Sequence, residues 1–260
     1  MEQTATRAMA NKVPLVTAAF WIIKVLATTV GETGADYLNF DIGLGLVATA
    51  AVMTAALVGA LVFQFRQKRY VPWIYWLVVV FLSIVGTLIT DLMTDNLGVS
   101  LYLSTALFLA ALASTFLLWW NKEHTLSIHA IDSRSREAFY WAAILFTFAL
   151  GTAAGDLLSE QMALGYVKSG LIFGGGIALV TLGYYVKALG PVLAFWIAYI
   201  LTRPLGASFG DFLTQAPKDG GLGLSTMTVS GMFLVLILML VGYLTVTGRD
   251  RLAESGAQPL

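Results

Sequence analysis

Four aspartates stand at equivalent places in the sequence and are the side chains with the clearest capacity for chemistry. Each follows a tryptophan by fifteen residues and a glycine by five. Carboxylate oxygens bind protons and hard cations such as Mg²⁺, Ca²⁺ or Mn²⁺. We therefore predict an ion-binding role for the four and, as a hypothesis, a divalent metal bound among them: Asp36, Asp91, Asp156 and Asp211.

Three further ionisable residues interrupt apolar stretches of the chain. Lys24 and Glu32 belong to the first stretch, and Arg203 belongs to the seventh. A charge at the centre of a membrane helix costs about 2.5–3.5 kcal/mol on insertion scales, so such a residue usually faces protein or water. At a rise of 1.5 Å per residue, Lys24 lies about 14 Å from Leu15, near the middle of a bilayer. We add all three to the candidate site.

Hydroxyl side chains accompany these charges. Arg203 takes the place of Thr28 in the last repeat, whereas the second and third repeats offer neutral hydroxyls that include Thr87 and Thr152. Such divergence favours a shaped substrate- or ion-binding site over a symmetric ring. In the first stretch a polar residue recurs every fourth position and so marks one helical face: Lys24, Thr28, Glu32 and Asp36.

The same residues also admit structural interpretations, which stay open at this point. Aspartate is common in turns, so each motif aspartate could cap a chain reversal. The buried charges could form an ion pair that fixes helix register. The repeated glycines favour close helix approach, and the repeated tryptophans favour anchoring at the membrane interface near the cytoplasmic ends of the helices.

The elements that carry these residues are predicted to be membrane-spanning helices. The 260-residue chain is 58% hydrophobic and 12% charged, against about a quarter charged in soluble domains. It has no cysteine, which excludes disulfides and thiolate metal sites, and its zero net charge gives no sign of a nucleic-acid partner. Eight segments approach the ~20 apolar residues needed to cross a bilayer: Leu15–Leu38, Ile42–Gln64, Val71–Met93, Leu97–Trp120, Ala138–Leu158, Gly165–Val186, Gly190–Leu213 and Leu222–Thr247.

An internal repeat organises these segments. An aromatic residue followed by tryptophan begins each odd-numbered segment, and the motif aspartates are 55, 65 and 55 residues apart. That spacing indicates a two-repeat half that was itself duplicated. Each repeat holds two spans, so all four share one orientation about an axis along the membrane normal. The predicted divisions are 1–14 (tail), 15–120 (first half), 121–137 (loop), 138–247 (second half) and 248–260 (tail).

The predicted fold is therefore an all-α membrane protein with eight transmembrane helices, arranged as four parallel two-helix repeats around a pseudo-symmetry axis. Eleven basic residues lie in the two tails and in the loops that join even to odd spans, and only Lys168 and Lys218 lie on the other side. The positive-inside rule then places both termini in the cytoplasm.

The repeated pattern resembles a family of bacterial multi-pass membrane-anchored proteins that are built from four copies of a short repeat of unknown function. The most recognisable stretch runs from Lys24 to Asp36, KVLATTVGETGAD, and the resemblance covers nearly the whole chain. It implies the same four-repeat fold and a place in the bacterial inner membrane. It implies no activity.

Three functions follow from these residues as alternatives. The first is a transporter or channel for a cation, divalent or proton-coupled, because further acids beyond the motif aspartates make the outer mouth negative and would concentrate cations. The second is a carrier of an anionic solute bound by Lys24 and Arg203. The third is a membrane scaffold or regulatory protein that uses the loop 121–137 for docking. The partners are the lipid bilayer and a small ion or solute; the oligomeric state is open.

An enzyme is not predicted. The sequence holds no HExxH, GxSxG or P-loop motif, each of which would place a metal, a nucleophile or a phosphate. Two aspartates could still meet across the bundle as an acid–base pair, which would require one of them to hold a proton. No cofactor is expected, and any divalent cation is predicted as substrate.

Overall fold

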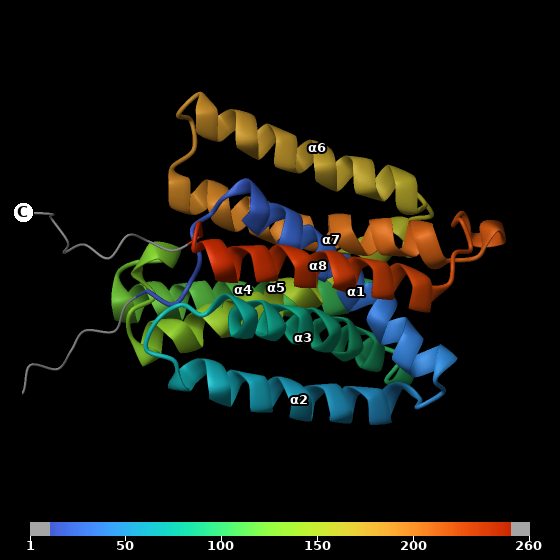
Figure 1. Ribbon diagram of the computed structural model, residues 1–260. Coiled ribbons are helices and arrows are strands. Elements are labelled where there is room, and N and C mark those ends of the chain that lie inside the picture. The colour runs from blue at the N-terminus through green and yellow to red at the C-terminus, as the bar shows by residue number, and fades with distance from the viewer. Residues whose placement is uncertain (1–10, 251–260) are drawn as a thin grey trace, which may run out of the picture.

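The computed structural model describes residues 11–250, which form eight α-helices running back and forth along one direction (Figure 1). The predicted tails 1–14 and 248–260 fall largely outside this range. Both described ends of the chain lie at the same end of the bundle, where the Leu15 amide donates to the Asp250 carbonyl. The helices are α1 (Ala18–Asp36), α2 (Leu46–Arg66), α3 (Pro72–Asp91), α4 (Leu101–Glu123), α5 (Arg134–Asp156), α6 (Tyr166–Tyr185), α7 (Pro191–Thr214) and α8 (Thr226–Thr247).

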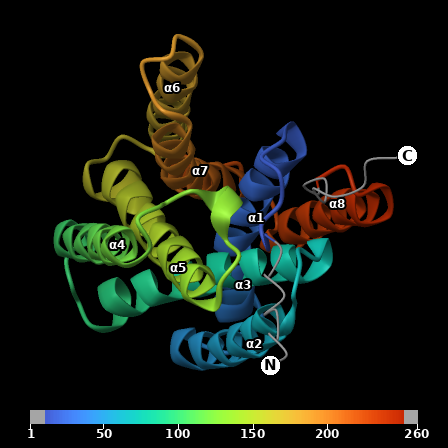
Figure 2. The same cartoon turned by 90° about the vertical axis from the view of Figure 1, so that its left-hand side faces the viewer.

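The odd-numbered helices form a closed inner ring. α1 packs against α3, α3 against α5, α5 against α7, and α7 returns to α1. Figure 2 looks onto the end of this ring and shows the even-numbered helices outside it. Each even helix packs on the odd helix of the following repeat: α2 on α3, α4 on α5, α6 on α7 and α8 on α1. Consecutive repeats are therefore interlocked around the ring.

The repeated glycines explain how the inner helices approach so closely. At each of the four contacts the motif glycine faces the residue seven after the motif tryptophan of the next helix, and a Cβ there would overlap that residue. Close approach through small residues was predicted, and the four contacts confirm it. The pairs are Gly31–Ser83, Gly86–Phe148, Gly151–Arg203 and Gly206–Thr28.

The aromatic pairs close the ring at the end that holds the chain termini. In each repeat the aromatic residue before the tryptophan contacts the tryptophan of the next repeat, with ring centroids 5.4 to 6.2 Å apart: Phe20–Trp76, Tyr75–Trp141, Tyr140–Trp196 and Phe195–Trp21. Three of the tryptophans are at most 4% exposed. The prediction of an interfacial anchor is therefore wrong for Trp76, Trp141 and Trp196. Their rings pack between helices because contacts with other rings bury more aromatic surface than a position at the membrane interface would.

A segment that precedes α1 seals the same end. Lys12 is buried and its ammonium lies 2.5 Å from the Glu137 carboxylate, which also accepts a hydrogen bond from Gln64. Nearby, Tyr70 donates to Asp250, and burial together with this bond raises the pKa of the tyrosine. The segment thus ties together the ends of α2, α5 and α8.

The motif aspartates mark a change in helical winding. In the first three repeats the aspartate is the last residue of the α-helix, and a single π-helical turn follows it: Tyr37–Asp41, Leu92–Asn96 and Leu157–Gln161. In the fourth repeat α7 continues past Asp211 to Thr214. Single π turns inside long helices are frequent at functional sites.

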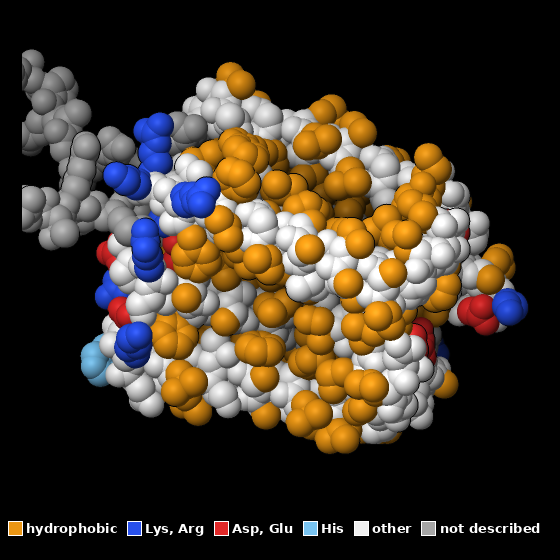
Figure 3. All heavy atoms as spheres, turned by 90° about the horizontal axis from the view of Figure 1, so that it is seen from below, with side chains coloured by type: hydrophobic (Ala, Val, Ile, Leu, Met, Phe, Trp, Pro, Cys, Tyr) orange, Lys and Arg blue, Asp and Glu red, His pale blue; other side chains and the backbone are white. Residues whose placement is uncertain are grey.

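Within residues 11–250, seven helices, α2 to α8, are long and apolar enough to cross a membrane. The eighth predicted span, α1, is not among them, and its 19 residues include the charged side chains Lys24, Glu32 and Asp36. Figure 3 shows a broad apolar surface between the two ends, with Lys and Arg side chains gathered at the end that holds the termini. The loop between α4 and α5 is shorter than the predicted 121–137, and it buries Ile128 and Ile131 against the bundle.

Candidate functional site on the bundle axis

Arg203 lies at the centre of the inner ring and is fully buried. One of its terminal nitrogens donates to the Glu32 carboxylate at 3.0 Å, to the Thr152 hydroxyl at 2.7 Å and, at a short distance, to the Thr87 hydroxyl. The other terminal nitrogen donates to the Thr28 carbonyl at 3.3 Å. One side chain of the fourth repeat is thereby joined to all three other repeats.

The three acceptors are equivalent positions of the repeat. Glu32, Thr87 and Thr152 each lie eleven residues after their motif tryptophan, and the fourth repeat has Ala207 there. The fourth repeat leaves room on the axis, and Arg203, four residues earlier, fills it. A charged hydrogen bond to Glu32 is stronger than one between neutral groups. The predicted residues Glu32, Arg203, Thr87 and Thr152 therefore form one cluster.

Thr28 contributes differently from what its sequence position predicted. Its hydroxyl donates to the Val25 carbonyl of its own helix at 2.6 Å and lies against Gly206. Only its backbone carbonyl reaches the cluster. Its side chain is used for packing α1 on α7, so the predicted solute-binding role of this hydroxyl is not supported by the geometry.

Lys24 lies one layer closer to the aromatic end. Its ammonium is fully buried and stands 4.3 Å from the ring centroids of both Phe148 and Tyr199. The predicted ion pair that fixes register exists between Arg203 and Glu32, and Lys24 takes no part in it. Phe148 and Tyr199 were not predicted as site residues. The sequence did hold a signal for them, because Phe148 is the repeat equivalent of Thr28 and Tyr199 is the repeat equivalent of Lys24.

The four motif aspartates surround the axis on the other side of Arg203. Asp211 is 5% exposed and the other three are half-buried. Glu32 lies close enough to repel all four carboxylates, and Arg203 attracts those of Asp91 and Asp156. Their carboxylates make no hydrogen bond or ion pair with any other residue in the described part of the chain. The alternative that they cap local turns is therefore not supported.

The hypothesis of a metal bound among the aspartates is not supported by their spacing. Among residues 11–250, no three His, Asp or Glu side chains are placed to hold one metal ion. The inner helices separate the four carboxylates around the axis, because each aspartate stands on a different helix. The four acids lie within one another's electrostatic influence and do not form a coordination sphere.

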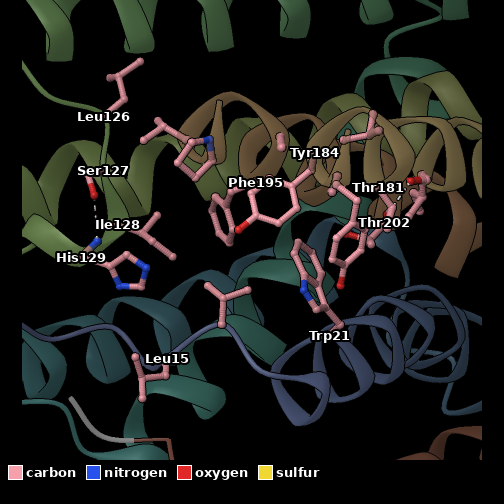
Figure 4. A pocket seen from close by; sticks show the side chains of 18 of the residues that line it. Leu15, Trp21, Leu126, Ser127, Ile128, His129, Thr181, Tyr184, Phe195 and Thr202 are labelled. Carbon is pink, nitrogen blue, oxygen red and sulfur yellow. Dashed lines mark hydrogen bonds between the residues drawn. The ribbon is translucent and has the colours of Figure 1, made fainter. Parts of the chain in front are cut away.

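A lateral groove of about 730 Å³ lies outside the ring, between α1, α6 and α7. Figure 4 shows Trp21, Phe195 and Tyr184 lining it, with Ser127 and His129 of the α4–α5 loop at one end. It includes none of the ionisable residues of the axis. The axial cluster and this groove are separate features.

Together the interlocked repeats and the apolar helices define a membrane-like helical bundle. Four matches to one family model cover residues 19–70, 74–125, 139–188 and 194–250, and each begins one residue before a motif aromatic pair. The chain belongs to this family, described as Repeat of Unknown Function (DUF347). No curated protein and no solved structure matches the chain.

Proposed function

We propose that the chain is a multi-pass protein of the bacterial inner membrane whose ring axis runs along the membrane normal, with both termini in the cytoplasm. The seven long apolar helices support a bilayer environment. The concentration of basic residues at the end that holds the termini supports the orientation, since cytoplasmic loops carry an excess of Lys and Arg. In this orientation the motif aspartates face the outer surface and the aromatic layer faces the cytoplasm.

We propose further that the protein is a cation transporter driven by, or coupled to, protons that bind the axial acids. One observation carries this proposal: four unpaired carboxylates surround the axis at one level, all within the field of Glu32, which is bound to Arg203. Intramembrane acids in such positions mark ion pathways and proton relays. Dispersed carboxylates favour protons or a partly hydrated cation over a dehydrated metal.

The Arg203–Glu32 pair is the proposed inner barrier. A cation that arrives among the aspartates competes with Arg203 for Glu32, and protonation of Glu32 removes the charge that holds the guanidinium. Either event loosens a contact that joins all four repeats. Movement of the aromatic layer below it would then open the axis toward the cytoplasm, a gating step of the kind that packed, bistable interfaces permit.

The test is flux in proteoliposomes that contain the purified full-length chain. Proton-coupled uptake of a panel of mono- and divalent cations is measured for the wild type, for D36N, D91N, D156N and D211N, and for E32Q. Asp95, an exposed acid that bonds to Thr94, supplies the control D95N. We expect at least tenfold lower flux in E32Q and in two or more aspartate variants. Equal flux in all variants would remove the proposal.

A further inference from the structure

Among the buried side-chain donors that have no acceptor within residues 11–250, three lie together between the Arg203–Glu32 contact and the aromatic layer. They are the Lys24 ammonium, the Nε–H of Arg203 and the Tyr199 hydroxyl. All three side chains are 0% exposed. Buried polar groups in folded proteins nearly always have a hydrogen-bond partner. Three donors without a partner in one region therefore indicate that an acceptor is missing there.

The donors belong to one neighbourhood. Lys24 stands 4.3 Å from the ring centroids of Tyr199 and Phe148, and the Arg203 guanidinium stands 5.9 Å from that of Phe148. The two cations therefore lie against the ring of the same phenylalanine and are close enough to repel each other. The terminal nitrogens of Arg203 donate to Glu32 and to hydroxyls, whereas its Nε–H has no acceptor within residues 11–250.

The charges of this layer do not balance. When Lys24 is protonated, this layer holds two positive charges, on Lys24 and Arg203, against the single negative charge of Glu32. A cation–π contact recovers only part of the free energy that burial of an ammonium costs. Aromatic faces also cannot satisfy the three N–H donors of an ammonium. The deficit is one negative charge with hydrogen-bond-accepting capacity.

We infer that Lys24, Arg203 and Tyr199 form a binding site for one small monovalent anion of the halide class. A spherical anion accepts bonds from several directions and needs no donor in return, which fits a set in which every member can donate a hydrogen bond. The site lies on the opposite side of the Arg203–Glu32 contact from the motif aspartates. It goes beyond the proposed cation pathway and does not depend on it.

Binding is tested on the purified full-length chain in detergent, with sodium bromide titrated against sodium gluconate at constant ionic strength. The melting temperature should rise with bromide and saturate, because a ligand that binds only the folded state stabilises it by mass action. K24M should abolish the rise. Y199F, which removes one donor and keeps the ring, should raise the apparent bromide Kd at least threefold.

The matched control is K122M. Lys122 also faces an aromatic ring, that of Phe139 at 5.9 Å, but at the exposed end of α4. Its variant should keep the wild-type bromide response.

Anomalous scattering from bromide-soaked crystals should give a peak beside Lys24.

Three results would overturn the inference. One is an equal melting temperature of the wild type in both salts, and another is an unchanged response in Y199F and K24M. The third is the combination of two observations: bromide does not change the melting temperature of the wild type, and K24M melts at a higher temperature than the wild type in gluconate. This combination would mean that Lys24 is neutral and needs no anion. If K24M does not fold, Y199F decides. The motif-aspartate variants should keep the bromide response whether or not they transport.

Discussion

The two halves of the ring axis are built in opposite ways. On the side of the chain termini, aromatic rings contact one another around the full ring, and the Lys12–Glu137 pair with its Gln64 bond covers that end. On the other side, four carboxylates lie around the axis without a hydrogen bond to any described residue. One half is held by ring contacts and the buried Lys12–Glu137 pair, with the Lys24 ammonium as its unpaired group, and the other holds four carboxylates that have no partner among the described residues.

The difference indicates that the end with the chain termini stabilises the fold, and that the end with the motif aspartates is available to bind ions. Paired buried charges and interlocking rings lock a structure, whereas unpaired carboxylates raise its energy unless water or a ligand reaches them. Arg203 stands at the boundary and binds the acids through Glu32 alone. Changes on the closed half should therefore cost stability, and changes on the acidic half should cost function.

The largest effect is expected from removing one partner of the buried pair at the closed end. E137A leaves the fully buried Lys12 ammonium unpaired, which costs about 3–5 kcal/mol of unfolding free energy. Reversible unfolding in mixed detergent micelles measures this cost. The double variant K12M/E137M should recover most of it, because two apolar groups can replace a buried pair. A double variant as unstable as E137A would show that the pair matters through packing and not through charge.

The next effect is expected at the ring contact of the repeat glycine. G206V places a branched side chain against Thr28 and Thr29 of α1, and overpacking of this kind costs about 1–3 kcal/mol or more. G59V is the matched control, since Gly59 lies on α2 with open space around its Cβ position. Equal unfolding free energies for the two variants would contradict the closed ring.

A smaller effect is expected from one hydroxyl of the aromatic layer. Tyr75 and Tyr140 share a buried hydrogen bond of 2.5 Å, and Y75F removes it at a cost of about 1 kcal/mol. Y102F is the control on the exposed face of α4. Unfolding free energies distinguish the two, and a loss in Y102F as large as that in Y75F would mean that this bond contributes nothing.

Much of this architecture was predictable from the sequence because the repeat fixes it. Tryptophan, glycine and aspartate recur at constant offsets, so one helix-pair pattern accounts for all eight elements. The glycine contacts followed from the small size of the residue. The stripe from Lys24 to Glu32 likewise predicted which faces of α1 turn inward, since i, i+4 residues share a face.

Other features could not be predicted because they depend on three-dimensional neighbours. The burial of the tryptophans follows from each aromatic pair contacting the next repeat, which no single repeat reveals. The different contacts of Lys24 and Arg203 depend on the neighbours of each side chain, since Arg203 bonds to Glu32 and Thr152 while Lys24 lies against Phe148 and Tyr199. The stacking of each even helix on the following repeat, instead of on its own, also leaves no signal in hydropathy.

The smallest effect on stability is expected on the acidic half, and it sharpens the contrast most. D211N removes a nearly buried carboxylate that Glu32 and Asp156 repel, so the unfolding free energy should stay within about 1 kcal/mol of the wild type or rise, because burying an unpaired charge is costly. D95N provides the exposed reference. Thermal unfolding measures both variants beside the flux assay. A loss of more than about 1 kcal/mol in D211N alone would mean that this carboxylate holds the fold together, and the acidic half would then be built on the same principle as the closed one.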